Sequence, residues 1–363
     1  MCYVNLWYNI EKDGGLEMLN LTKPSRLKRG DKIATVSLSW GGAGDKEILW
    51  RYYQGKKRLE EEFGLEAIEM ENTLKGSEFL YNHPEKRAED FMNAFKDKSI
   101  KGIFSCIGGY ESIRMLPFID FDVIRNNPKI FIGYSDTTVS HMICLKAGLS
   151  SFYGPAVLSE FAENMNMFDY TKYWINKVLF NTESIGTINS SDIWTSEYLP
   201  WDECNKYISR NTKANNGVEV LQGSGKVRGR LIGGCIEVLE MVKGTKLWPE
   251  EKLWEDSILF FETSEDKPSP VYFEYWLRNY GSQGILEKSK GIIFGKPYDN
   301  QYYEEYKKVI YKVIRDELRL KDLPILYNMN FGHTAPMITL PYGALAEIDC
   351  DNNTFSILES GVI

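Results

Sequence analysis

The sequence predicts an α/β protein, with a doubly wound, mostly parallel sheet in an N-terminal domain and a smaller, β-rich mixed α/β C-terminal domain. From residue 30 onward, short apolar runs alternate with helix-like segments. The runs lack polar alternation, as is typical of parallel strands covered on both faces. At 363 residues the chain is also too long for one ordinary core, so two domains are expected.

The N-terminal elements follow one another in β-α order. Strands are expected at 32–40, 66–70, 102–109 and 129–134, with helices at 45–63 and 83–97. Pro84 supports the second helix, because a first-turn residue needs no N–H. This order predicts a Rossmann-like domain over 18–180, whose ligands lie outside the carboxyl ends of its strands.

The pattern changes after residue 180. Residues 181–217 are polar but aromatic, and we interpret them as a substrate-binding loop or linker. The C-terminal domain, 218–363, is expected to hold a strand, a glycine turn and a helix within 225–244, strands at 257–263, 291–297 and 324–333, helices at 269–281 and 301–318, and a hairpin turning at 351–353. Residues 1–17 match no element and are interpreted as a disordered or artefactual extension.

Composition excludes several classes of function. The net charge of -8 argues against binding of a nucleic-acid polymer or an acidic membrane, but it allows one small anionic ligand. Six scattered cysteines show neither a C-x-x-C pair nor a histidine at metal-ligand spacing. This pattern predicts free thiols, no metal or other cofactor, and a cytoplasmic location. No apolar run reaches the ~18 residues of a membrane span, and the N-terminus lacks a signal-peptide pattern.

Ser135 follows a short apolar run directly, in "FIGYSDTT". It is either a nucleophile on a strand-to-helix turn or the N-cap of the following helix. A nucleophile needs a base, and the chain has three histidines. His141 lies six residues further along the same expected helix and cannot reach the serine, while His83 is a helix-start or surface residue. His333 remains, although it could equally be a hydrogen-bonded loop histidine.

Glu262 ends the apolar run "LFFE", where a carboxylate is costly unless it is paired. It could orient His333, or it could form a plain salt bridge. Glu265 and Asp266 lie further into the loop and are interpreted as solvated. The chain order of serine, acid and histidine is the one that hydrolases of the nucleophile-elbow type use.

Backbone groups near Ser135 could stabilise an oxyanion. The N–H of Asp136 lies at the start of a helix, and glycines 108 and 109 allow a second backbone donor to approach closely. The glycine loop at 41–44, the Gly108-Gly109 loop and the Ser135 turn all follow strands. They therefore belong to one edge of the predicted sheet, which predicts a site there.

The motifs "FSCIGGYES", "FIGYSDTT", "GRLIGGCIEVL", "LFFETSED" and "NFGHTAP" resemble those of the serine LD-carboxypeptidases of the S66 class. The resemblance runs from about Gly30 onward and is nearest to the microcin C immunity branch. It implies a triad of Ser135, Glu262 and His333, with an oxyanion hole from the backbone of Asp136 and the glycine turn, with Gly109 favoured over Gly108. It also implies a site between two domains, a cytoplasmic homodimer and no metal.

The resemblance implies two alternative substrates. Immunity members cut the amide that joins a peptidyl or aminoacyl carboxyl group to a nucleotide-like group, and tryptophans on a long loop stack on the base. Cell-wall members release D-alanine from murein tetrapeptide. We expect the first activity, with Trp201 stacking in preference to Trp194; the alternative is that both indoles only pin the loop.

Three further residues bear on the substrate. Lys267 could hold a substrate carboxylate. Cys235 stands where the family has asparagine and cannot replace its amide group, which puts the substrate in question. Cys235 as a nucleophile is a weaker alternative. In a different class of function, the chain would only bind a nucleotide or phosphate through the loop at 41–44, although its glycine spacing matches no phosphate-binding motif.

Overall fold

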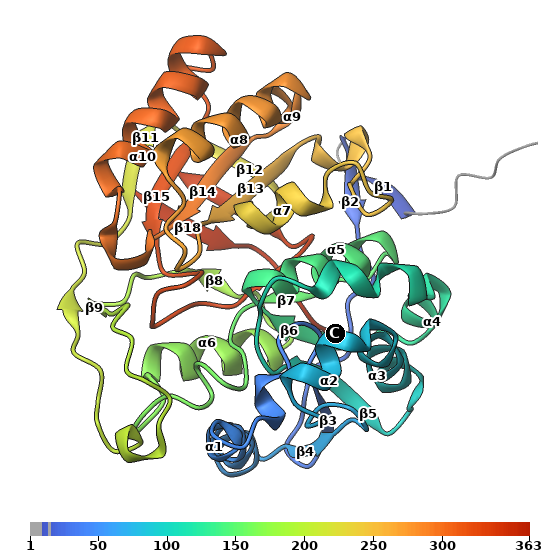
Figure 1. Cartoon of the computed structure of the whole chain (residues 1–363). Helices are drawn as coiled ribbons and strands as arrows, with labels where there is room; N and C mark the ends of the chain where they lie inside the picture. Colours follow the sequence, from blue (N-terminus) through green and yellow to red (C-terminus); the bar gives the residue numbers. More distant parts are fainter. Residues whose placement is uncertain (1–8, 14–15) are drawn as a thin grey trace, which may run out of the picture.

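The structure is a computed structural model that describes residues 9–13 and 16–363. It contains two large sheets, which Figure 1 shows one above the other, the first in blue and green and the second in yellow to red. The α/β fold class is confirmed. No helix in the described part of the chain is both long and apolar enough to cross a membrane.

The first sheet has the order β16-β7-β6-β5-β3-β4. Its strands are β3 (Lys32–Val36), β4 (Glu66–Glu69), β5 (Ile100–Ser105), β6 (Ile130–Gly133), β7 (Phe152–Tyr153) and β16 (Leu340–Pro341). Strands β3 to β7 are parallel, and β16 is antiparallel. Ile33, Ile103 and Phe131 are fully buried, as expected for a sheet covered on both faces.

The helices of this half are α1 (Leu49–Glu61), α2 (Ser77–Asn82), α3 (Pro84–Lys96), α4 (Phe121–Asn126), α5 (Thr138–Lys146) and α6 (Asp169–Leu179). Three expected bounds were wrong, one of them in the strand expected at 102–109, which ends at Ser105. The first strand ends at Val36, because the chain turns toward the β5 loop, where the Trp40 N–H donates to the Gly108 carbonyl. The first helix begins at Leu49 because a 3₁₀ turn, Gly42–Gly44, precedes it.

The second sheet has the order β11-β15-β14-β13-β12-β17-β18-β8. Its strands are β8 (Gly186–Thr187), β11 (Glu219–Gln222), β12 (Lys226–Cys235), β13 (Ser257–Glu262), β14 (Gly291–Gly295), β15 (Ile325–Met329), β17 (Leu345–Asp349) and β18 (Thr354–Ile357). The central strands β12 to β15 are parallel. The helices are α7 (Ile236–Val242), α8 (Pro270–Ser282), α9 (Ile285–Lys288) and α10 (Tyr303–Ile310), which continues as a π-helical segment, Tyr311–Glu317.

The expected glycine turn within 225–244 was wrong, because β12 continues through both glycines to Cys235. The neighbouring strand β13 lies so close that a Cβ on Gly233 would overlap the carbonyl oxygen of Phe260. These glycines therefore serve close strand packing rather than a reversal of the chain. The expected terminal hairpin is confirmed, with Asp349 paired to Thr354.

Two segments need separate comment. Within the expected extension 1–17, β1 (Asn9–Asp13) pairs with β2 (Leu16–Asn20) in antiparallel fashion. Residues 1–8 and 14–15 lie outside the described residues, so the expected disorder or artefactual origin stays a prediction. Within 181–217, β9 (Ile193–Trp194) pairs with β10 (Lys213–Ala214). This long segment also supplies β8 to the second sheet, so it is anchored at two places.

Candidate active site

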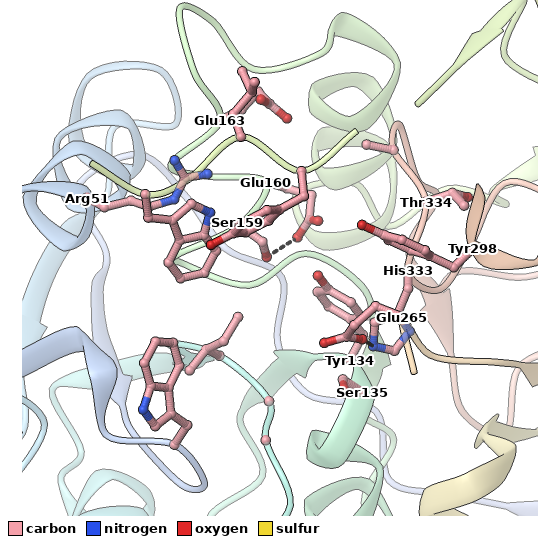
Figure 2. A pocket seen from close by; sticks show the side chains of 18 of the residues that line it. Arg51, Tyr134, Ser135, Ser159, Glu160, Glu163, Glu265, Tyr298, His333 and Thr334 are labelled. Atoms are coloured by element: carbon pink, nitrogen blue, oxygen red, sulfur yellow. Dashed lines mark hydrogen bonds and ion pairs between the residues drawn. The ribbon is translucent and has the colours of Figure 1, made fainter. Parts of the chain in front are cut away.

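The carboxyl ends of the two parallel sheets meet around one cavity of about 520 Å³. Ser135 follows β6, and His333 lies in the loop after β15; both line the cavity. Figure 2 shows Ser135, Tyr134, His333 and Glu265 gathered at one end, with Arg51 and Glu163 at the other. The volume lies in the range of small-molecule sites.

Ser135 has a φ of 64°, a left-handed conformation that costs a non-glycine residue ~1 kcal/mol or more. Its N–H donates to the Tyr153 hydroxyl at 3.1 Å. The side chain forms no helix cap: Tyr134 precedes the 3₁₀ turn Ser135–Thr137, Thr137 precedes α5, and neither end has a side-chain cap bond. The geometry therefore favours the strained strand-to-helix turn over the N-cap interpretation.

His333, which lines the cavity, is paired with Glu262, which does not. The distance from His333 Nδ1 to Glu262 Oε2 is 2.7 Å, and the Tyr153 hydroxyl donates to the other carboxylate oxygen. Glu262 is 2% exposed. Tyr153 thus links the backbone of Ser135 to Glu262, a connection that the sequence analysis missed because Tyr153 lies in a two-residue strand outside the motifs it used.

The other ring nitrogen of His333, Nε2, lies 3.0 Å from Glu265 Oε2. In the described residues no hydrogen bond joins this nitrogen to the Ser135 hydroxyl. Burial disfavours the imidazolium, but the carboxylates of Glu262 and Glu265 outweigh it and raise the pKa of His333 to about 9. Glu265 is exposed, as expected, but it also pairs with His333, a contact that the sequence analysis did not predict.

The Gly108-Gly109 loop packs directly on the Ser135 turn. A Cβ on Gly108 would lie 2.7 Å from Ser135 Cβ and 3.2 Å from the Asp136 nitrogen, so only glycine fits there. The buried Asp136 carboxylate holds the loop in place: one oxygen accepts the Ser39 hydroxyl at 2.6 Å and the Glu111 N–H at 2.9 Å. Sequence reasoning considered only the backbone of Asp136.

Of the two predicted tryptophans, Trp201 lines the cavity and Trp194 does not. The ring of Trp201 lies 6.2 Å from that of Trp40, and the Arg51 guanidinium lies 4.6 Å from its centroid. Trp194 is buried, with Lys296 Nζ 4.6 Å from its ring centroid, so its position matches the loop-pinning alternative.

Cys235 and Lys267 also lie outside the residues that line the cavity. Burial, together with Glu237 and Glu262, raises the pKa of the Cys235 thiol well above its usual value, which disfavours a thiolate nucleophile. Lys267 Nζ lies 3.8 Å from Asp299 Oδ2.

The other two histidines lie away from the proposed chemistry. His141 is buried, with its ring nitrogens bound to Ser151 and to the Gly133 carbonyl, and burial lowers its pKa to about 3. His83 is paired with Glu85 at 2.9 Å on the surface. In the described part of the chain, no group of three or more His, Cys, Asp or Glu side chains is placed to hold a metal ion.

A charged network at the far end of the cavity was missed by sequence analysis, because its members come from distant segments. Arg210 binds Glu163, and Arg51 donates to Asn164 Oδ1 at 2.9 Å. Glu160 is also buried there, accepting the Ser159 hydroxyl at 2.7 Å, and burial raises its pKa.

Family comparisons agree with this arrangement. Residues 33–154 match the model of the LD-carboxypeptidase N-terminal domain, and residues 228–348 match that of the C-terminal domain. The chain belongs to the LD-carboxypeptidase family, peptidase family S66. Both matched segments of the chain contribute to the cavity, Ser135 coming from the first and His333 from the second.

Similar proteins include the microcin C7 self-immunity protein MccF of Escherichia coli, 34% identical over 313 residues, which span 85% of this chain and 88% of the relative. The crystal structure of an MccF-like protein from Streptococcus pneumoniae in complex with AMP has a TM-score of 0.83 and 34% identity, covering 90% of this chain and 98% of that chain. The structure of MccF in complex with glutamyl sulfamoyl guanosine has a TM-score of 0.80 and 30% identity, and the match covers 94% of this chain and 99% of that chain.

Proposed function

We propose that this LD-carboxypeptidase family member is a serine hydrolase that cleaves the amide joining an aminoacyl or peptidyl carboxyl group to a nucleotide-like group. Ser135 is the nucleophile, His333 the general base and Glu262 the group that orients it. The observation that supports this most directly is the position of the strained Ser135 turn in the same cavity as a histidine whose Nδ1 is paired with a buried carboxylate.

The proposed chemistry is acyl transfer. His333 takes the Ser135 proton as Oγ attacks the scissile carbonyl, and Glu262 stabilises the resulting imidazolium. The N–H groups of Asp136 and Gly109 stabilise the oxyanion, each contributing ~3 kcal/mol in comparable sites. His333 then protonates the leaving amine, and water hydrolyses the acyl-enzyme. During these steps Nε2 of His333 must face Ser135 rather than Glu265.

The nucleotide part of the substrate fits the aromatic end of the cavity. Trp201 and Trp40 line it, and the Arg51 guanidinium packs on Trp201. An aromatic face contributes ~1–3 kcal/mol when it stacks on a base. Two similar solved structures contain AMP and glutamyl sulfamoyl guanosine, which supports a nucleotide-linked substrate.

A cytoplasmic homodimer is part of the same proposal. In the described residues, Cys106, Cys144, Cys204, Cys235 and Cys350 are free thiols, which agrees with a reducing compartment. Light scattering on the purified chain measures its oligomeric state, and a monomer at micromolar concentration would contradict the dimer.

The function is tested by incubating the enzyme with an aminoacyl sulfamoyl adenosine and with murein tetrapeptide. We expect cleavage of the first, and loss of at least ~10⁴-fold in kcat for Ser135→Ala with the fold retained, because the nucleophile is gone. Ser140→Ala is the matched control: Ser140 is a buried serine on α5 whose hydroxyl has no partner in the described residues.

Three outcomes would contradict the proposal. Preferential cleavage of murein tetrapeptide would assign the cell-wall activity. Substantial turnover by folded Ser135→Ala would remove the serine mechanism. Binding of the nucleotide compound without hydrolysis, and without labelling by a fluorophosphonate, would make the chain a binding protein.

A further inference from the structure

His333 is held between two carboxylates. Nδ1 lies 2.7 Å from Glu262 Oε2, and Nε2 lies 3.0 Å from Glu265 Oε2 (Figure 2 shows Glu265 beside His333). The Tyr134 ring packs edge-on against the imidazole, with centroids 5.1 Å apart, and Glu237 adds a further negative field. An imidazole that donates from both nitrogens is the protonated, positively charged form.

This arrangement conflicts with the proposed mechanism. A general base must present an unprotonated Nε2 to the Ser135 hydroxyl, and Glu265 occupies that nitrogen. The two carboxylates differ in mobility. The Glu262 side chain is fully buried and held by Tyr153, whereas the Glu265 side chain is 55% exposed on the loop after β13. Glu265 is therefore the group that must move.

Water alone competes weakly with the imidazolium for Glu265, so a second cation is needed to draw the carboxylate away, and the described lining of the cavity offers none that is free. The cationic side chains there besides His333 are Arg51 and Arg210. Arg210 is bound to Glu163, and Arg51 donates to the Leu158 carbonyl at 2.6 Å and to Asn164. The replacement cation must therefore come with the substrate.

We propose that Glu265 binds the α-ammonium group next to the scissile carbonyl of the substrate, and that this binding releases His333 to act as the base. The inference rests on the proposed function and specifies its substrate as an acyl group with a free α-amino group. The scissile carbon must lie ~3 Å from Ser135 Oγ. The α-nitrogen lies only ~2.5 Å from that carbon, within reach of the carboxylate that Nε2 gives up.

The release step involves one proton. When Glu265 turns to the substrate ammonium, the imidazolium loses one of the two carboxylates that stabilise it. The Nε2 proton passes to water, and its lone pair becomes available to the Ser135 hydroxyl. Glu262 remains on Nδ1 and keeps the ring oriented. Without an α-ammonium group, His333 stays protonated at neutral pH and the serine is not activated.

Binding is measured first, by calorimetry with Ser135→Ala, which cannot turn the ligand over. The ligands are alanyl sulfamoyl adenosine and its N-acetyl derivative, which lacks the positive charge. We expect the free amine to bind at least ~10-fold more tightly, as a charge-assisted hydrogen bond predicts. Adding Glu265→Gln should bring the two affinities within ~2-fold of each other. Asp266→Asn is the matched control: it removes a carboxylate from the same loop, and it should keep the preference.

Kinetics supply the second readout. With the N-acetyl substrate, which does not titrate, the acidic limb of kcat/KM reports His333 in the free enzyme. Glu265→Gln should shift this limb to lower pH and raise the rate at pH 7, which a purely structural role would not do. Equal affinities for the two ligands in the Ser135→Ala protein, a preference that persists in Glu265→Gln, or an unshifted limb would overturn the inference. Failure of the wild-type enzyme to cleave either compound would instead overturn the proposed function, while the binding comparison still decides the role of Glu265.

Discussion

At the scale of single residues, Tyr153 connects Ser135 with Glu262, two members of the proposed triad. Its hydroxyl accepts the Ser135 N–H and donates to Glu262, so one buried oxygen fixes both the strained turn and the acid. The residue is 1% exposed, and its burial disfavours the phenolate and raises its pKa well above the usual value. Tyr153 is thus a positioning residue rather than a proton donor in the chemistry.

Replacing Tyr153 by phenylalanine tests this role. The change leaves the Ser135 N–H without its partner and removes a donor from Glu262, which costs ~1–3 kcal/mol of unfolding free energy. We expect kcat to fall ~10- to 100-fold with KM little changed, because the base is less well oriented. Steady-state kinetics and a thermal melt measure both effects.

Tyr342→Phe is the matched control, because it also removes a buried hydroxyl, one that donates to the Gly233 carbonyl at 2.7 Å. It should lower the melting temperature without changing kcat. Equal effects of the two variants on kcat would show that Tyr153 has no special role.

The two buried histidines predict opposite effects of pH on stability. The raised pKa of His333, about 9, means that folding favours its protonated form, so its stabilisation is complete below ~6.5 and is lost as pH rises through 9. The lowered pKa of His141, about 3, means the reverse, so its stabilisation is present above ~6.5 and is lost as pH falls toward 3.

Urea unfolding between pH 6.5 and 9.5 measures the first effect. Relative to His333→Gln, the wild-type protein should lose up to ~3 kcal/mol of unfolding free energy across this range. The comparison with the variant removes contributions from other titrating groups. Parallel pH profiles for the two proteins would contradict the raised pKa.

Single residues also show where sequence reasoning succeeds. The triad hypothesis could be formed because Ser135, Glu262 and His333 each follow an apolar run, which local pattern reveals. The roles of Tyr153 and Glu265 could not be predicted in this way. Tyr153 contacts Glu262 across the two sheets, and Glu265 contacts His333 from the loop of another strand in its own sheet. Local pattern does not reveal either tertiary contact.

At the scale of elements, the loop between β5 and the following 3₁₀ helix (Ser112–Phe118) leaves no room for a larger side chain at Gly108. The Asp136 carboxylate accepts N–H groups from Glu111 and Ser112, and Gly108 touches the nucleophile turn. A rigid loop at this point keeps the proposed oxyanion donors in a fixed position before the substrate arrives.

Gly108→Ala should therefore abolish activity while most of the fold persists. The added Cβ would lie 2.7 Å from Ser135 Cβ and 2.8 Å from its Oγ, so either the loop or the turn must shift. We expect kcat/KM to fall by at least ~100-fold, the loss typical of one misplaced oxyanion donor. Hydrolysis and fluorophosphonate labelling measure it.

Gly102→Ala, on strand β5 itself, is the control. Its Cβ would meet only side-chain atoms, at 3.2 Å or more, so it should cost some stability and leave activity largely intact. An active Gly108→Ala enzyme would show that the loop does not position the site.

The bounds of helices and strands were predicted well where the hydrophobic periodicity of the sequence was strong. They were predicted poorly where tertiary packing determined the backbone conformation. Helix α3 and the terminal hairpin match their expected ranges closely. Strand β12 does not, because the closeness of β13 at Gly233, rather than local propensity, lets the strand continue past this position. The β1–β2 hairpin was missed although its sequence contains the glycine pair Gly14-Gly15, a common hairpin signal, because the segment precedes the α/β pattern on which the prediction rested.

At the scale of the whole molecule, the two sheets exchange strands. Strand β16, from near the end of the chain, pairs with β7 in the first sheet, and β8, from the segment 181–217, pairs with β18 in the second. Side chains add to this: Tyr110 donates to Asp266 across the cavity at 2.8 Å, and the Cys235 N–H donates to Thr138 Oγ1 at 3.1 Å.

These pairings predict that the protein unfolds in one cooperative step. The first sheet needs β16 and the second needs β8, and each of these strands lies far along the chain from the strand it pairs with. Circular dichroism and tryptophan fluorescence should give coincident urea transitions. Two separated transitions would show that the halves are independent domains.

Synthesis on the ribosome imposes an order on this architecture. The edge of β7 that β16 later covers stays open until residues 340 and 341 have emerged, and an open strand edge invites pairing with other chains. The nascent protein would therefore depend on rapid completion or on a chaperone at this stage. The same delay places the Ser135 turn on the ribosome long before His333, so under the proposed mechanism a half-made chain has its nucleophile without its base.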